Sequence, residues 1–408
     1  MAVPQNNLEM QMEDRISALP DGILCHILSF IPTVDAITTS SLSKRWRPLW
    51  RSIPVLDIQL DEILGGCVYA SFFNFAFATL LVHSAQHPLT LARLRITPRA
   101  AAHYIFPNAY FNVWVKAILE RHIEQLHLEM PRVYPIYSGV FSCRTLVVLK
   151  LCRVSVDVLQ SIDLPRLKTL HLDFVRIEGV EYVARILRGC PILEEFETNH
   201  VFFDYNVVEY QSMCKLVRAH IGKNFGFQVP LKAMSNVQSL RLFLERSSFR
   251  KMLSIFSCCL KLLQLNHQDD FPVFPNLIHM ELGFERYVNW DVVLELLEHC
   301  PKLQILVLNM PLVPNKPLIP VLPEIWSCPQ FDPKFVPECI SSKLRKCTIL
   351  GYTGIKCEMQ FAKYIMHFSG ALQTMTIHHC ADMQDKLQKQ QELAMFPKSS
   401  ATCKLLFE

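Results

Sequence analysis

Three consecutive residues near the end of the chain, His378, His379 and Cys380, are the side chains best suited to hold a metal ion. Imidazole and thiolate groups are common zinc ligands, but adjacent residues rarely converge on one ion. No partner pair of ligands stands elsewhere in the sequence at the spacing that structural zinc sites use. We therefore expect no metal site.

Acid–base or nucleophilic catalysis needs a reactive group with a partner at a recognisable spacing. His127 and His171 stand next to strand-like positions without such a partner. We expect Asp269 and Asp270 to be acidic residues of a loop, with substrate contact as the alternative. The motifs G-x-S-x-G, H-E-x-x-H, G-x-G-x-x-G and the phosphate-binding P-loop are absent, and only 12 glycines occur in 408 residues. The sequence predicts neither a catalytic residue nor a cofactor site.

The charge of the chain argues against one class of function, and its cysteine content indicates the compartment. The 41 basic and 37 acidic residues give a formal net charge of +4, which is too balanced for a protein whose main role is nucleic-acid binding. The 15 cysteines form no C-x-x-C pair, and residues 1–15 lack the apolar core of a secretory signal. Such scattered cysteines fit a reducing compartment. We expect free thiols and a location in the cytoplasm, the nucleus or both.

One segment is long enough to cross a membrane. Residues 63–82 contain no charge, and 15 of these 20 residues are apolar. Glycines and polar residues interrupt the run, and the acids Asp61 and Glu62 flank it without a basic anchor. We expect a buried helix and no membrane contact. The alternative, a membrane-anchored receptor, would place the preceding and following parts of the chain on opposite sides of the membrane.

The most informative pattern is a repeat, L-x-x-L-x-L, in which other apolar residues replace some leucines. From Ile123 to Val237 its copies start 21 to 26 residues apart, within the range of about 20–29 residues typical of leucine-rich repeats. The last two apolar positions alternate, as in a short strand that points both side chains into one core. Clear copies are Leu146/Leu149/Leu151, Leu167/Leu170/Leu172, Val237/Leu240/Leu242 and Leu303/Leu306/Leu308.

A helical spacing separates these strands. Apolar residues recur at i, i+3, i+4 and i+7, which places them on one face of a helix. The prolines of Cys190-Pro191 and Cys300-Pro301 should end two of these helices before the next strand. One strand and one helix per repeat of about 25 residues predict an α/β solenoid. The three sets are Val180/Val183/Ala184/Leu187, Phe249/Met252/Leu253/Phe256 and Trp290/Val293/Leu294/Leu297.

The repeats depart from regularity in two ways. The asparagine that usually follows the strand is mostly absent, and Val154, Val175 and Pro311 stand at its offset, so we expect an irregular solenoid. Within residues 311–337, prolines then recur at every third position from Pro311 to Pro323, the period of a polyproline II helix. We expect a stiff connector there, with a ligand for a proline-binding domain as the alternative.

The N-terminal module, residues 13–53, is small but rich in apolar residues. Leu24, Ile27, Leu28 and Ile31 share the spacing of one helical face. A module of about 40 residues makes only a small core, so several of its apolar side chains should face a partner.

Three blocks of the sequence resemble plant F-box proteins that carry leucine-rich repeats and a C-terminal FBD domain. The first runs from Asp14 to Trp50 and contains D-R-I-S-x-L-P-D and L-S-K-R-W-R-x-L-W. The second consists of the repeat joints C-P-x-L-E and C-P-K-L. The third is the tail, with V-P-E-C from Val336, L-x-x-x-x-I-x-G-Y-x-G from Leu344, and F-P-x-x-S-x-T-C-K-x-x-F from Phe396.

The resemblance implies an adaptor role. The F-box of this family docks on a Skp-type adaptor, which joins a cullin–RING ubiquitin ligase, while the repeats bind the target protein. The basic residues Lys44, Arg45 and Arg47 are expected on a solvated face. For each docking residue, burial inside the F-box is the alternative. Carried over by position, the docking face comprises Leu19, Pro20, Ile23, Leu24, Ile27, Leu28, Leu42 and Trp46.

The tail has the same strand and helix pattern as the repeats. Phe361, Tyr364, Ile365 and Phe368 share a helical face, and strand-like runs flank them at residues 344–349 and 372–377. We predict that the FBD region continues the solenoid's sheet and caps its end. The expected fold is thus α/β: a small all-helical F-box, then an irregular leucine-rich-repeat solenoid capped by an FBD region of the same strand–helix type.

The expected parts are an F-box at 13–53, a connecting helix and first repeats at 54–122, repeats at 123–310, the proline-rich connector at 311–337 and the FBD domain at 338–408. The expected function is that of a non-catalytic substrate-recognition subunit of a ubiquitin ligase. The alternative is an F-box scaffold or binding protein that acts outside ubiquitin transfer.

Overall fold

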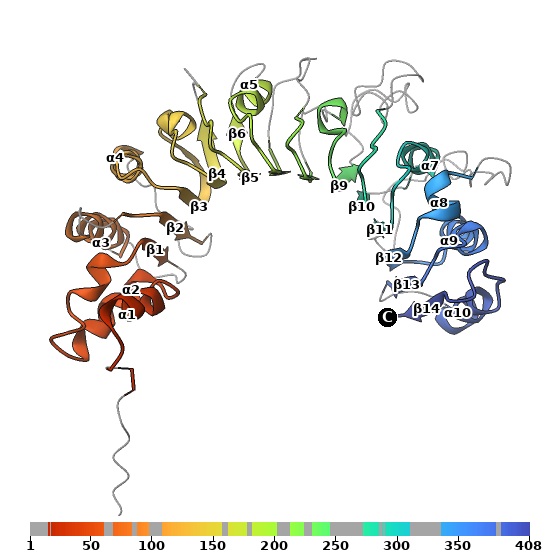
Figure 1. Cartoon of the computed structure of the whole chain (residues 1–408), viewed down its shortest axis with the longest axis horizontal. Coiled ribbons are helices and arrows are strands. Elements are labelled where there is room, and N and C mark those ends of the chain that lie inside the picture. The colour runs from red at the N-terminus through yellow and green to blue at the C-terminus, as the bar shows by residue number, and fades with distance from the viewer. Residues whose placement is uncertain are drawn as a thin grey trace, which may run out of the picture. The chain divides into compact units, whose positions relative to one another are not determined.

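The computed structural model describes residues 15–16, 18–60, 68–83, 88–97, 108–156, 162–177, 182–201, 213–223, 231–244, 272–284, 288, 290–310, 336–380 and 385–408. The chain forms two compact units, residues 1–132 and 133–408, each of which is described by itself (Figure 1). The second periodic set, Phe249 to Phe256, and the proline repeat from Pro311 to Pro323 lie outside the described residues.

The first unit begins with a small helical module. Its helices are α1 (Asp21–Leu28) and α2 (Thr33–Thr38), followed by short 3₁₀ turns at Thr39–Ser41 and Leu49–Ser52. Pro20 and Pro32 have extended backbones directly before the two helices, as expected for residues that cannot donate a helical hydrogen bond. The module's core consists of Leu24, Leu28, Ala36, Trp46, Leu49 and Ile53.

Three parallel strands complete the first unit. They are β1 (Val55–Leu60), β2 (Leu91–Ile96) and β3 (Gln125–Pro135), which extends past the end of the unit. The helix α3 (Val68–Val82) follows β1, and α4 (Asn108–Leu119) follows β2. The indole Nε1 of Trp114 on α4 donates a hydrogen bond to the backbone oxygen of Ala76 on α3 at 3.2 Å. Helix and strand therefore already alternate here.

Within the uncharged segment 63–82, the structure describes residues 68–82, which form α3. Phe72, Phe73, Ala76 and Leu80 of this helix are buried, whereas Leu81 is 81% exposed, so the helix is buried on one face only. Among the helices that the structure describes, none is both long and apolar enough to span a membrane.

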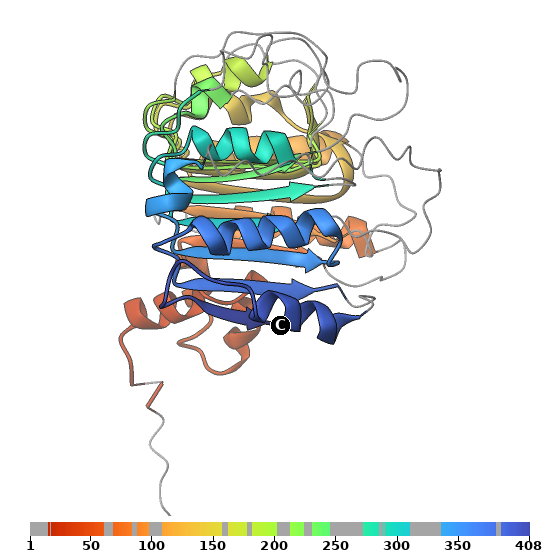
Figure 2. The same cartoon turned by 90° about the vertical axis from the view of Figure 1, so that its right-hand side faces the viewer.

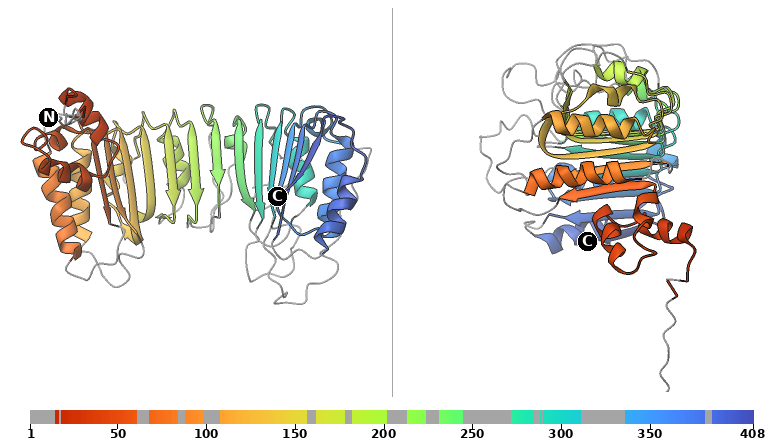
Figure 3. Two further views of the ribbon diagram at one scale, coloured as in Figure 1. Left: turned by 90° about the horizontal axis from the view of Figure 1, so that it is seen from below. Right: turned by 90° about the vertical axis from the view of Figure 1, so that its left-hand side faces the viewer.

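The second unit is built on a ladder of parallel strands, seen side by side in Figure 3. Most are separated by a helix or a 3₁₀ turn. The strands are β4 (Val148–Val156), β5 (Thr169–Asp173), β7 (Glu195–Asn199), β8 (Arg218–Ile221), β9 (Ser239–Leu244), β10 (His279–Phe284), β11 (Ile305–Asn309), β12 (Lys346–Tyr352), β13 (Thr374–His379) and β14 (Lys404–Phe407), and the short β6 (Arg176–Ile177) pairs with β4. The helices are α5 (Tyr182–Arg188), α7 (Trp290–Glu298), α8 (Glu338–Ser342), α9 (Lys356–Phe368) and α10 (Lys386–Ala394), with 3₁₀ turns at Ser138–Ser142 and Leu231–Met234.

The strand register confirms the alternation predicted from the leucine repeat. Leu149 of β4 pairs with Leu170 of β5, and both side chains are fully buried. The residues between the leucines, Lys150 and His171, also pair and are only half-buried. Inward-pointing apolar side chains therefore form the core, and the intervening polar ones lie on the opposite face of the sheet, which we call the open face.

The helix pattern is confirmed where the structure describes it, with one shift. Trp290, Val293 and Leu297 of α7 are buried as expected, but Leu294 is only half-buried, and Val292 and Leu296 are buried instead. The buried face of α7 therefore includes Val292 and Leu296, which the four-residue pattern does not contain. α5 and α7 end two residues before Cys190-Pro191 and Cys300-Pro301 respectively, in agreement with the predicted stops.

The tail continues the sheet of the repeats, as predicted. β11 pairs with β12 in parallel, and β13 and β14 extend the ladder. Helices α9 and α10 cover one face of these last strands (Figure 2). The Phe361 ring of α9 stacks on the Trp290 ring of α7, with centroids 4.6 Å apart, and the Cys339 thiol donates to the Leu297 oxygen at 3.1 Å. The FBD region thus shares its core with the last repeat.

This shared core predicts the effect of a truncation. Removing residues 338–408 should expose the edge of β11 and one side of Trp290, so we expect a lower melting temperature and aggregation. Light scattering and thermal melts of residues 1–337 against the full chain provide the measurement. A monomer with an unchanged melting temperature would instead show that the FBD region is an independent appendage.

The cysteines mostly behave as small buried apolar residues. Ten of the described cysteines are free, as expected, whereas Cys357 is bonded in a disulfide. Burial raises the pKa of the Cys190 and Cys339 thiols to about 12, so both are uncharged at neutral pH.

Candidate functional site

The helical N-terminal module divides the eight predicted docking residues between its interior and its surface. Leu24 is 0% exposed, and Leu28 and Trp46 are buried beside it, so these three form the module's own core. For these three residues the structure agrees with the alternative, burial inside the module, because residues one turn apart on α1 pack together against Ala36 and Leu49. Leu19 is half-buried and packs against the same core.

The other predicted docking residues lie on the surface. Ile23 is 48% exposed and Ile27 45% exposed on α1, Pro20 is exposed directly before this helix, and Leu42 is 66% exposed. Ile23 and Ile27 are separated by one helical turn, so they form a continuous apolar stripe on the side of α1 away from its core. Large exposed aliphatic side chains on a small module indicate a protein-binding surface.

Phe30 and Val34 are exposed apolar residues near this stripe that the predicted docking set does not contain. Phe30 is 76% exposed just after α1, where its ring makes an edge-on contact with His26, and Val34 is exposed on α2. The signal was present, because Phe30 and Val34 continue the spacing of Ile23 and Ile27, but Pro32 obscures it by ending the first helix. We define the α1 surface as Pro20, Ile23, Ile27, Phe30, Val34 and Leu42.

Arg45 is exposed, as expected from the sequence, and it also contacts the start of α1. Its guanidinium Nη2 lies 2.6 Å from Asp21 Oδ1 and also donates to the backbone oxygen of Leu19. Both side chains are substantially exposed, so this ion pair contributes little free energy by itself. Its effect is geometric, because it joins the later turns of the module to the segment that presents Pro20 and Ile23.

The open face of the second unit carries a row of paired charges. Along successive strands the row reads Lys150, His171, Glu197, His220, Arg241 and Glu281, each in register with the next. Arg241 Nη2 lies 2.6 Å from Glu281 Oε2, and His220 Nδ1 lies 3.0 Å from Glu197 Oε1. The hydrogen bond from His220 lowers the pKa of the Glu197 carboxyl, and burial together with Lys150 lowers the pKa of His171. The cross-strand contacts hold the polar side chains of this row in place.

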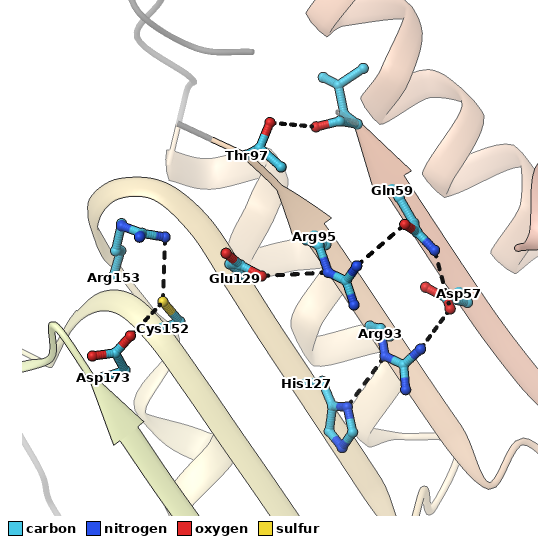
Figure 4. A network of polar contacts seen from close by, with 11 residues as sticks. Asp57, Gln59, Arg93, Arg95, Thr97, His127, Glu129, Cys152, Arg153 and Asp173 are labelled. Carbon is cyan, nitrogen blue, oxygen red and sulfur yellow. Dashed lines mark hydrogen bonds and ion pairs between the residues drawn. The ribbon is translucent and has the colours of Figure 1, made fainter. Parts of the chain in front are cut away.

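The first unit has a smaller polar network on the same type of strand positions (Figure 4). Arg93 Nη1 lies 2.7 Å from Asp57 Oδ2, and its Nε donates to His127 Nδ1 at 3.3 Å. Arg95 Nε lies 3.4 Å from Glu129 Oε2. Thr33 Oγ1 of α2 accepts a hydrogen bond from the backbone N–H of Asp57 at 2.8 Å, so β1 is tied directly to the helical module.

The residues considered for metal chemistry point to different neighbours. His378 Nδ1 lies 3.5 Å from Glu408 Oε2, whereas the His379 ring stacks on Phe407. Among the described residues, no group of three His, Cys, Asp or Glu side chains could hold a metal ion. Asp269 and Asp270 lie outside the described residues.

Comparison with known proteins matches all three parts of the chain. An F-box domain family matches residues 16–57, the family "FBD-associated F-box protein At5g56370, LRR repeats" matches residues 111–243, and the FBD family matches residues 332–377. The chain is similar to two Arabidopsis thaliana proteins. F-box/FBD/LRR-repeat protein At4g26340 is 28% identical over 448 residues, and FBD-associated F-box protein At5g56370 is 28% identical over 436 residues. Each alignment covers 97% of this chain and 100% of the relative, which confirms the resemblance inferred from the sequence.

Proposed function

Because this chain belongs to the family of F-box proteins with leucine-rich repeats and an FBD region, we propose that it is the substrate-recognition adaptor of a Skp–cullin–F-box ubiquitin ligase. The α1 surface is the observation that supports this proposal most directly. Its large side chains are exposed on a folded module, held in place by a buried core and by the Arg45–Asp21 pair. A Skp-type adaptor is the partner that covers this surface.

The repeats supply the second half of the proposed function. Their open face presents polar side chains fixed by cross-strand ion pairs, which suits recognition of another protein surface. The mechanism is proximity: the repeats hold the target while another subunit of the ligase presents ubiquitin, so the effective concentration of the target lysines rises. The chain itself needs no catalytic residue for this role. The proposed location is the cytoplasm, the nucleus or both.

Co-purification with a cullin tests this proposal. The full chain, expressed with an affinity tag in plant cells, should recover a Skp-type adaptor together with a cullin, because the F-box connects to the ligase only through that adaptor. A Skp-type adaptor without any cullin would favour the alternative, an F-box scaffold that acts outside ubiquitin transfer. Recovery of neither protein would refute the adaptor role.

A further inference from the structure

Three successive repeats contain a non-glycine residue with a left-handed backbone at matching positions, within β4 and directly after β5 and β7. The φ angles are 56° at Arg153, 51° at Phe174 and 51° at His200. A side chain with a Cβ atom destabilises this conformation. In β12 the corresponding position is Gly351, with φ of 71°, which adopts the same conformation without that cost.

The repeat needs the backbone conformation at these positions, and not the side chains. In each case the left-handed residue turns the chain so that the next residue enters the core. Val154, Val175, Val201 and Tyr352 are all fully buried in this way. Glycine would satisfy this requirement in every repeat. The backbone requirement alone therefore does not account for the side chains of Arg153, Phe174 and His200.

These side chains stack on one another along one rim of the sheet. The Arg153 guanidinium lies over the Phe174 ring at 5.5 Å, and the Phe174 and His200 rings stack with centroids 4.2 Å apart and an angle of 13° between their planes. Lys223 and Phe243 extend the row, with Nζ of Lys223 4.8 Å from the Phe243 ring centroid. We call the row Arg153, Phe174, His200, Lys223 and Phe243 the rim ladder.

A second glycine, Gly283, lies beside Phe243 at the end of the rim ladder. Gly283 of β10 pairs with Phe243 of β9, and a Cβ atom at Gly283 would lie 2.7 Å from Cδ2 of the phenylalanine ring. The Phe243 ring therefore lies directly against the backbone of the next strand, where any larger residue would displace it. Its position supports the cation–π contact with Lys223.

Positive charge prevails along the rim ladder. It contains the cations Arg153 and Lys223, and Oδ1 of the neighbouring acid Asp173 lies 3.8 Å from Nδ1 of His200. Oδ2 of Asp173 accepts a hydrogen bond from Cys152 Sγ at 3.5 Å (Figure 4). Oδ1 accepts a hydrogen bond from Asn199 Nδ2 at 3.1 Å. Stacking on aromatic rings holds the cationic groups in place, so little side-chain entropy is lost when an anionic group binds.

We propose that the rim ladder binds an acidic, extended segment of the protein that the repeats select. This inference rests on the proposed function, in which the repeats hold a target protein. From Arg153 on β4 to Lys223 after β8, the ladder crosses three strand spacings of about 4.8 Å, or about 14 Å, which equals about four residues of extended chain. Carboxylates of such a segment would contact the cations, and its stem atoms would lie on the rings of Phe174 and Phe243.

Glycine substitution offers a test that spares the fold. The full-length triple variant Arg153→Gly, Phe174→Gly and His200→Gly removes three ladder side chains at positions where glycine is the unstrained residue. Its melting temperature should stay at or above that of the parent chain. Fluorescence anisotropy with a labelled oligo-glutamate peptide should show affinity that falls as salt rises, and the variant should lose about tenfold or more of it. Lys343→Ala, which changes an exposed cation of the FBD region, is the matched control and should bind like the parent.

Three outcomes would overturn the proposal. The parent chain could bind oligo-glutamate no better than an uncharged Gly-Ser peptide, or it could prefer a single-stranded oligonucleotide. The triple variant could also bind the peptide as well as the parent while losing thermal stability, which would make the ladder a purely structural stack. Binding of a Skp-type adaptor by the same samples, measured in parallel, separates a failure of this inference from a failure of the proposed function.

Discussion

Replacing Ile23 and Ile27 with aspartate should strongly weaken adaptor docking while leaving the protein folded. Both side chains are nearly half exposed on α1, so new carboxylates remain hydrated in the free chain. In the complex the same carboxylates would be buried against an apolar partner without a counter-charge. We expect a loss of about 2–4 kcal/mol of affinity for a purified Skp-type adaptor, about 30- to 1000-fold in Kd. Biolayer interferometry of the full chain measures it.

Two controls make the docking experiment specific. Val113→Asp on α4 introduces one carboxylate at another exposed apolar position and should leave the affinity unchanged. Leu24→Ala should weaken docking only together with a lower melting temperature, because Leu24 belongs to the module's core. If the Ile23→Asp, Ile27→Asp double variant binds the adaptor as tightly as the parent, the α1 surface is not the docking surface.

The helical module shows what apolar spacing can and cannot determine. α1 has only eight residues and carries apolar side chains on two faces, so spacing predicts the helix but not which face is inside. Leu24 and Leu28 face inward because α2 and the later turns supply Ala36, Trp46 and Leu49 on that side. That choice depends on residues distant in the sequence. The resemblance to F-box proteins identified the module, but it placed core and surface residues in one predicted docking set.

The repeats were more predictable, because each strand must point alternate residues into one core. Leu149, Leu170 and Leu306 therefore lie where the pattern placed them. The left-handed residues were not predictable, since Arg153 and Phe174 stand where backbone preference favours glycine or asparagine. Val154 and Val175 were recognised at the offset of the missing asparagine, but only the structure shows that a left-handed residue turns each of them into the core.

Leu149→Asp should destabilise the repeats far more than the same substitution at the adjacent Lys150. Leu149 is fully buried and pairs with the equally buried Leu170, so an aspartate there would be an unpaired charge inside the core. We expect a loss of about 4 kcal/mol or more, seen as a large drop in melting temperature or as insoluble protein. At Lys150, on the open face beside His171, the carboxylate would stay in contact with water, and a change within about 1 kcal/mol is expected.

Leu149→Ala is a milder substitution that tests the same point if the Leu149→Asp variant does not fold. Leu149→Ala leaves a cavity without introducing a charge and should cost about 3 kcal/mol, still well above the effect of Lys150→Asp. Thermal melts of the three variants beside the parent chain give this ranking directly. Equal tolerance at positions 149 and 150 would mean that the two side chains do not alternate between core and open face. The pairing of Leu149 with Leu170, on which the description of the repeats depends, would then be wrong.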